Sequence, residues 1–295
     1  MSPELTRPIH RRAIPSLGLL ACCLFAATGM QPVSAQLPML EPPWLGYYAV
    51  HAMGKYQFQI FSNNASAIFH REVKGSEQMD PLAIRIDFFV RETLPDGKFI
   101  VRNILPETLE GIQPPTTKLE KSVIRGKVTG NAAFEAVFEQ SHGIISMGGR
   151  ILDPGTLKNP QFCIRTTFPT LEIEKKAPAA SLSKRDAKKL EREMARKSKS
   201  GTMELKWTDS KRIKQDLEVA VDAGSKELNG PGIAAVEIKT TVYDGKKFIL
   251  LASSNSAMTL SNPGYGQLKR GFSLIWSADP GKDKTGAARF SFEMR

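Results

Sequence analysis

The sequence predicts a mainly β protein of antiparallel, sandwich-like architecture that carries one basic α-helical insertion. Short runs in which apolar and polar residues alternate recur along the chain, separated by Gly, Asn, Ser and Pro, which is typical of strands joined by turns. Two such runs meet at the dipeptides Asp96-Gly97 and Asp244-Gly245, and these residues tolerate the positive φ of tight hairpins. Residues 176–201 depart from this pattern with a run of helix-forming residues.

Residues 1–35 have the features of a secretory signal peptide. Arg11-Arg12 precede an uncharged, mostly apolar stretch from Ala13 to Met30, and small residues then lead up to Ala35, where signal peptidase would cleave. We therefore expect an exported bacterial protein, periplasmic or extracellular. A lipoprotein anchored at Cys22 is the less favoured alternative, because the apolar run continues beyond that cysteine.

The rest of the chain, residues 36–295, is long enough for one large β domain or two smaller ones. We expect an N-terminal β-rich unit over 36–175, a basic helical insertion over 176–201 and a C-terminal β-rich unit over 202–295. The alternative is that the two β-rich units form one continuous domain.

Period-two alternation defines the predicted strands. They cover residues 56–61, 83–90, 98–104, 122–128, 132–140, 143–151, 162–168, 170–175, 203–207, 216–221, 235–243, 247–253, 272–278 and 288–294. Before each Asp-Gly turn lie two alternating runs, and after it an apolar run that begins with Phe-Ile. This order predicts two copies of a three-strand meander. An internal duplication is one explanation, and the chance recurrence of a common hairpin is the other.

The net charge of +11 is concentrated in one segment. Residues 175–200 hold ten Lys or Arg against three acids, a net charge of +7, whereas the remainder of residues 36–295 carries only +2. The charge therefore describes this segment and not the whole protein.

Within this segment a helix is predicted from Lys184 to about Lys197, with Gly201 just beyond its end. Its apolar stripe holds only Leu190 and Met194 as large residues, which is too narrow for a core helix. If the flanking runs 170–175 and 203–207 pair, the helix projects from the tip of a β-hairpin.

Such a basic helix suits contact with an anionic surface: a membrane, lipopolysaccharide or a cell-wall polymer. The residues that would make this contact are Lys184, Arg185, Lys188, Lys189, Arg192, Arg196, Lys197 and Lys199. Nucleic acid is not favoured, because the protein is expected to be exported and no aromatic residues interleave the basic ones. The alternative is a solvated insertion whose charge only maintains solubility.

Aromatic residues cluster near the expected mature N-terminus. Trp44, Tyr47 and Tyr48 could stack on sugar rings, although packing of these rings on the body of the protein is the more common use. They are the candidate carbohydrate-binding residues.

The sequence predicts no catalytic residue, cofactor or metal site. The histidines show no metal-ligand spacing, and Ser141 beside His142 is not expected to form a dyad, because neighbours on a strand point to opposite faces. Cys163 is the only cysteine of residues 36–295 and reads as a small residue on a strand face. Strand acids available for a glycosidase pair are Asp87, Glu135, Glu139, Glu172 and Glu237.

These observations favour a non-enzymatic envelope protein that binds or scaffolds through residues 184–199. The alternative is a β-sandwich hydrolase or carbohydrate-binding module that acts on an envelope or extracellular polysaccharide. A cleft lined by aromatic rings and converging carboxylates would favour the second interpretation. The sequence does not predict the oligomeric state.

Overall fold

The structure is a computed structural model. It describes residues 47–53, 56–61, 66–71, 83–112, 120–169, 185, 201–216, 226–240, 243, 245–261 and 271–295. All of them belong to one compact unit, residues 37–295. The predicted signal peptide and most of the predicted basic helix lie outside the described residues.

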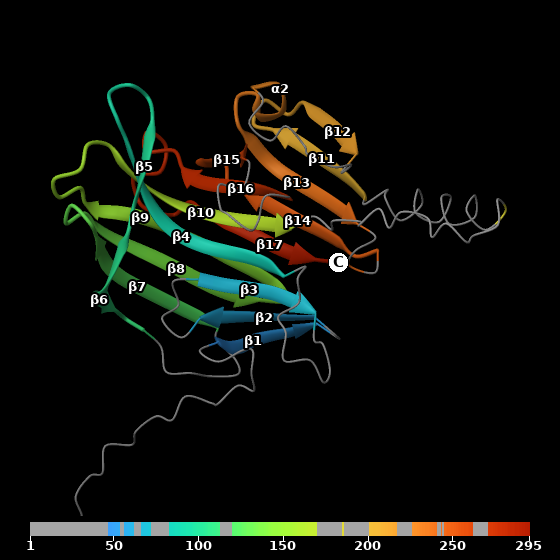
Figure 1. The fold of residues 1–295 in the computed structure, drawn as a ribbon, viewed down its shortest axis with the longest axis horizontal. Helices are drawn as coiled ribbons and strands as arrows, with labels where there is room; N and C mark the ends of the chain where they lie inside the picture. Colours follow the sequence, from blue (N-terminus) through green and yellow to red (C-terminus); the bar gives the residue numbers. More distant parts are fainter. Residues whose placement is uncertain are drawn as a thin grey trace, which may run out of the picture. The chain divides into compact units, whose positions relative to one another are not determined.

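The 17 described strands form one continuous antiparallel sheet that is curled so that two halves face each other (Figure 1). The first half-sheet has the order β1 (Tyr47–Met53), β2 (Tyr56–Phe61), β3 (Ser66–Arg71), β4 (Ile84–Thr93), β10 (Pro160–Pro169), β16 (Gly271–Ala278) and β15 (Ser256–Ser261). The second half-sheet has the order β12 (Arg212–Asp216), β11 (Gly201–Trp207), β13 (Ile233–Thr240), β14 (Lys247–Ala252), β17 (Phe290–Met294), β9 (Ile144–Asp153), β8 (Ala133–Ser141), β7 (Lys121–Val128) and β6 (Ile104–Glu110). The predicted mainly β, sandwich-like fold is confirmed.

Among the described residues the sheet itself joins its two halves at two places, in addition to chain crossings such as β9 to β10 and β14 to β15. At one margin β13 and β15 share a single bridge, Ile233 to Met258. At another, β5 (Phe99–Arg102) pairs with β4 and then passes through Asn103 into β6, which pairs with β7. A short helix, α2 (Lys226–Asn229), precedes β13. Strands that precede residues 176–201 lie beside strands that follow them: β10 pairs with β16, and β9 pairs with β17.

The core lies between the half-sheets and is rich in phenylalanine. Phe248 of β14 is fully buried. Its ring centroid lies 5.5 Å from that of Phe69 and 5.9 Å from that of Phe168, both in the first half-sheet. It also lies 5.7 Å from Phe292 and 4.8 Å from Tyr243. Each fully buried ring contributes about 1.5–3 kcal/mol through the removal of apolar surface from water, so this cluster holds the halves together.

Tight turns set the register of the hairpins. Gly97 closes the β4–β5 hairpin with a φ of 79°. Its N–H donates to the Leu94 carbonyl at 2.9 Å, and the Leu94 N–H donates to the Lys98 carbonyl at 2.8 Å. The β8–β9 hairpin turns at His142 and Gly143, with φ of 49° and 78°, as a two-residue loop between paired Ser141 and Ile144 requires.

Two predictions about strand pairing are wrong. The run 203–207 does not pair with 170–175, which lies outside the described residues, because both edges of β11 are occupied by β12 and β13. The basic segment therefore connects β10 of the first half-sheet to β11 of the second. The first predicted three-strand meander is also absent, because β3 lies between β2 and β4. The first run of the second predicted meander, 216–221, lies outside the described residues except for Asp216.

The Asp-Gly hairpins themselves are present as β4–β5 and β13–β14. Their surroundings differ, since Phe99 of β5 is exposed while Phe248 of β14 is fully buried. The resemblance between the two sequences extends over the turn and its flanks alone.

Replacing Phe248 with alanine is expected to lower the free energy of unfolding by about 3–5 kcal/mol, because the cavity would open between both half-sheets. The measurement is urea unfolding followed by tryptophan fluorescence. The control is Leu251→Ala on the same strand. Because the Leu251 side chain is 45% exposed, this change should lower the free energy of unfolding by less than about 1 kcal/mol. Equal losses in the two variants would contradict the central position assigned to Phe248.

Candidate functional site

Every strand acid that the sequence singled out and the structure describes faces a basic partner. Asp87 lies 3.2 Å from Arg165, Glu139 lies 2.9 Å from Lys121, and Glu237 lies 2.7 Å from Lys247, measured between nitrogen and oxygen atoms. Glu135 has two partners, described next, and Glu172 lies outside the described residues. The described strand acids thus form ion pairs and not a carboxylate pair.

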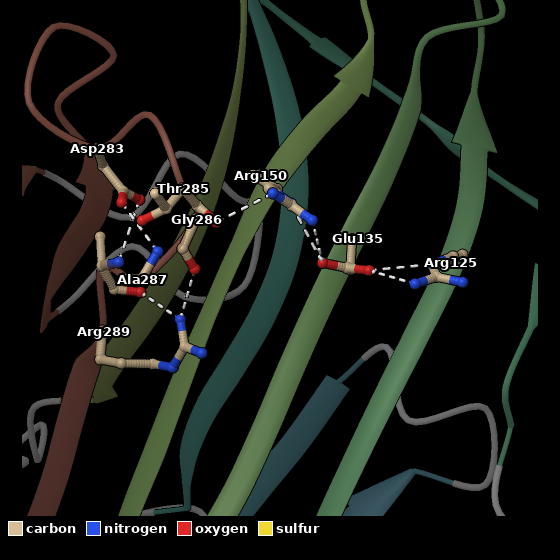
Figure 2. Close-up of polar contacts among 9 residues, drawn as sticks. Arg125, Glu135, Arg150, Asp283, Thr285, Gly286, Ala287 and Arg289 are labelled. Atoms are coloured by element: carbon tan, nitrogen blue, oxygen red, sulfur yellow. Dashed lines mark hydrogen bonds and ion pairs between the residues drawn. The ribbon is translucent and has the colours of Figure 1, made fainter.

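The strongest of these clusters consists of Arg125, Glu135 and Arg150 on adjacent strands β7, β8 and β9 (Figure 2). The Arg125 Nε and Nη2 donate to Glu135 Oε2 at 2.9 and 2.8 Å. Arg150 donates through Nε to Glu135 Oε1 at 3.2 Å. The Glu135 side chain is only 12% exposed, against 61% for Arg125 and 41% for Arg150. A single shielded carboxylate therefore lies between two accessible guanidinium groups.

A loop before β17 extends this network. Arg150 Nη1 donates to the Thr285 carbonyl at 3.0 Å, and Arg289 Nη1 donates to the Gly286 carbonyl at 2.8 Å. The loop is ordered by Asp283, whose carboxylate accepts the backbone N–H groups of Ala287 at 2.8 Å and Ala288 at 3.1 Å (Figure 2). The polar network fixes a loop against the outer face of the sheet.

Glu135 is held as a carboxylate. Its partial burial alone would raise its pKa, but the hydrogen bond from Arg125 and the positive charges of Arg150 and Arg125 outweigh burial and lower the pKa below 4.5. A glycosidase general acid requires the opposite, a carboxyl whose pKa is raised. The cluster is suited to stabilising the sheet face and not to proton donation.

A second buried acid, Glu92 of β4, has the same character. Its carboxylate accepts the Lys158 backbone N–H at 2.8 Å and the Arg102 Nε at 3.0 Å. The hydrogen bond from Lys158 and then that from Arg102 lower the pKa of Glu92. The Arg102 contact joins β5 to β4, and the Lys158 contact joins this hairpin to the turn before β10.

A shallow hollow of about 300 Å³ lies beside the Arg125 side chain and is lined by Glu110, Gly111, Val123 and Arg125. Gly111 approaches the neighbouring strand closely, since a Cβ there would lie 2.3 Å from the Val123 carbonyl oxygen. Its described lining contains one carboxylate and no aromatic ring. The aromatic cleft with converging carboxylates that would favour a hydrolase is not present among the described residues.

The predicted carbohydrate-stacking residues are only partly described. Tyr47 and Tyr48 lie in β1, opposite Phe61 and Ile60 of β2, but their side chains, like the whole of Trp44, lie outside the described part of the chain. Of the predicted basic contact residues, Arg185 is described, in helical conformation and exposed. The other seven lie outside it.

Ser141 and His142 correct one expectation. Because His142 occupies a left-handed turn and not an extended strand, its Nδ1 comes within 2.7 Å of Ser141 Oγ. Both residues are exposed, and the pair lies at a hairpin tip without an enclosing pocket among the described residues.

The Cys163 thiol is fully buried, and burial raises its pKa to about 12. A thiol with that pKa is not a nucleophile at neutral pH, so the structural interpretation of Cys163 holds. Among the described residues, no group of His, Cys, Asp and Glu side chains is placed to hold a metal ion. No helix in the same residues has the length and apolar character to cross a lipid bilayer.

Sequence reasoning missed the pairing within this charged face, although a signal for it exists. Lys121 and Glu139, and likewise Arg125 and Glu135, lie at equal distances on either side of the turn at Gly130. In a hairpin, residues placed symmetrically about the turn face each other. The partner Arg150 and the loop that contains Asp283 could not be found this way, because they come from more distant sequence.

Comparison with known proteins adds little. No protein-family model matches the chain, and no curated protein matches it in sequence. Among solved structures, the backbone is similar to the alpha-N-acetylgalactosaminidase NagBb from Bifidobacterium bifidum, in its GalNAc complex, at 11% identity and a TM-score of 0.43. The match covers 83% of this chain but 35% of that one, so the chain spans well under half of the enzyme's length. This likeness carries no argument about function.

Replacing Glu135 with glutamine is expected to lower the free energy of unfolding by about 1 kcal/mol at neutral pH, because two arginines lose their carboxylate. The pKa of Glu135 is lowered in the folded protein, so its contribution is present above the ordinary value of 4.5 and is lost as pH falls through the folded value. The difference between wild type and variant should therefore vanish in acid. Unfolding titrations at pH 7 and at several acid pH values measure it.

The matched control is Glu139→Gln, on the same strand and face, whose carboxylate is 36% exposed and whose partner Lys121 is 63% exposed. Glu139→Gln should lower the free energy of unfolding by less than about 0.5 kcal/mol. If the free energies of unfolding of wild type and Glu135→Gln still differ at low pH, then the packing of the side chain, and not its charge, is responsible for the stability difference.

Proposed function

We propose that the chain is an exported, non-enzymatic envelope protein whose inserted basic segment contacts an anionic surface. The observation that carries this proposal is the separation of charge. Residues 175–200 carry +7, whereas the rest of residues 36–295 carries +2. Four acids of the described strands, Asp87, Glu135, Glu139 and Glu237, are paired with basic residues of the same sheet. The inserted segment is where uncompensated charge accumulates.

The position of this segment supports the proposal. It connects Pro169, paired with Gly271, to Gly201, paired with Thr240, so both of its ends continue into paired strands. A contact made by the segment would thus be transmitted directly to the sandwich.

The chemistry of the contact is electrostatic. Each Lys or Arg near an anionic membrane contributes about 1 kcal/mol, and the attraction falls off within a Debye length of about 8 Å at physiological ionic strength. Only Leu190 and Met194 are available for insertion into a bilayer, so the contact would be superficial and salt-sensitive. Lipid headgroups, lipopolysaccharide and acidic wall polymers share this anionic chemistry.

Residues 36–295 are expected to sediment with anionic phospholipid vesicles at low salt, to be released at physiological salt, and to ignore neutral vesicles. Replacing Lys184, Lys188, Lys189 and Lys197 with glutamine should weaken binding by at least about tenfold, given about 1 kcal/mol for each charge. The matched control replaces four exposed lysines of the described body, Lys127, Lys214, Lys226 and Lys239, and removes the same charge.

Equal weakening by both sets would mean that net charge, and not the segment, governs binding. Parallel assays with lipopolysaccharide and with an acidic wall polymer separate the sources of anionic charge. Failure of the folded protein to bind any of the three would overturn the proposed function.

Export is tested separately. Expression of the full chain in a bacterium should yield a processed form whose mass and N-terminal sequence begin at Gln36, after cleavage behind Ala35. The matched control is Ala35→Arg, which should block processing because signal peptidase requires a small residue there. A mature form that begins at a lipid-modified Cys22 would instead show the lipoprotein route.

A further inference from the structure

Strand β5 presents exposed apolar side chains at an edge of the described sheet, where the Arg91 guanidinium of β4 lies 4.4 Å from the Phe99 ring centroid. Phe99, Ile100 and Val101 are consecutive and 57%, 37% and 47% exposed. Among the described strands β5 pairs with β4 alone, and the β4–β5 hairpin ends at the turn around Gly97 (Figure 1). Exposed apolar edge strands are templates for pairing with another strand.

The backbone hydrogen-bonding groups of this edge can be assigned. Because Leu94 and Lys98 form a hydrogen-bonded pair, and bonded and non-bonded pairs alternate along an antiparallel ladder, Phe99 opposite Thr93 is a non-bonded position. The N–H and C=O groups of Phe99, and by the same alternation those of Val101, therefore point away from β4. They are available to a further strand.

Another edge strand of the described sheet shows the usual protection. β12 pairs with β11 alone among the described strands and presents the exposed charges Arg212 and Lys214. Charged side chains on an edge discourage further pairing. β5 lacks such residues over its first three positions, Phe99 to Val101, so its apolar character needs an explanation of its own.

We propose that β5 pairs with β5 of a second copy of this chain to form an antiparallel, twofold-symmetric dimer. Phe99 and Val101 flank Ile100 symmetrically, so an antiparallel copy places Phe99 opposite Val101 of the second copy and Ile100 opposite Ile100. The outward backbone groups then meet in bonded pairs, and each apolar side chain faces an apolar one. A twofold interface requires this self-complementarity.

The local charge of the hairpin is small although the chain as a whole is basic. The paired part of the hairpin, residues 90–102, carries two acids, Asp96 and Glu92, which pair with Lys98 at 3.0 Å and with Arg102. Its third base, Arg91, donates to the Gln161 side chain at 2.7 Å. Each hairpin thus brings one net positive charge to the contact. The strand has only four residues, and interfaces well below about 1,000 Å² are weak, so the dimer should be reversible and concentration-dependent.

The experiment is sedimentation velocity of residues 36–295 over increasing protein concentration. Wild type should show a rise in sedimentation coefficient toward that of a dimer. Val101→Lys should abolish the rise. Val101→Pro should also abolish it, because proline removes an outward N–H while it keeps the apolar surface and leaves the bonds to β4 intact. The matched control, Leu251→Lys, changes a side chain of similar exposure, 45%, on the central strand β14, and should dimerise like wild type.

Circular dichroism establishes that each variant is folded. A rise that survives Val101→Pro would show that an apolar patch, and not strand pairing, drives association, and would overturn the proposal. Loss of the rise in Leu251→Lys would do the same, because the effect would not be confined to β5. Wild type that stays monomeric at all concentrations would assign the edge to another protein and refute self-pairing.

Discussion

The fold depends on the contact between two rows of phenylalanine rings, one from each half of a single curled sheet. Phe58 and Phe69 of the first half-sheet meet Phe248 and Phe292 of the second, with ring centroids 5.5–6.4 Å apart. A sheet hydrophobic on one face must cover that face, and here the sheet covers itself. Among the described residues the sheet joins its halves at the Ile233–Met258 bridge and at the passage from β5 to β6, and the chain crosses between them elsewhere, as from β9 to β10 and from β14 to β15. None of these connections covers the apolar inner faces, so the ring packing is the structural condition for everything on the outer surface.

The outer face of the second half-sheet follows from this condition. Residues that alternate with the core positions must meet water, and on β7 and β8 they are charged residues of opposite sign placed in register. Glu135 between Arg125 and Arg150 is the extreme case. Such pairs add little stability singly when exposed, but they give each of these carboxylates a basic partner, and at Glu135 they lower the pKa.

The sequence predicted most strands because their two faces differ in polarity. It missed β15 although burial alternates along that strand, because a serine, Ser256, occupies a buried position. β3 was missed because residues 67–70 are all buried, so its polar and apolar residues do not alternate with exposure. The predicted strand 98–104 covers β5 but only the first residue of β6 (Ile104–Glu110), because Pro106 within β6 is atypical of a strand interior. Strand order was beyond reach because local alternation indicates which face is buried and not which strand lies alongside. In the candidate site, the Arg125–Glu135 pair could be derived from hairpin symmetry, whereas Arg150 and the Asp283 loop required the tertiary fold.

The location of the basic segment has a physical rationale that does not depend on what it binds. A chain that leaves one half-sheet and enters the other must cross outside the hydrogen-bonded ladder, and β10 and β11 are already paired on both edges. The cost of lengthening such a connection grows only with the logarithm of its length, so charge and helix-forming residues can accumulate there without disturbing the core. The same positions placed within a strand would put lysine against the phenylalanine rows. The fold therefore accommodates a strongly basic segment in a crossing such as this one without a change in the core of the sandwich.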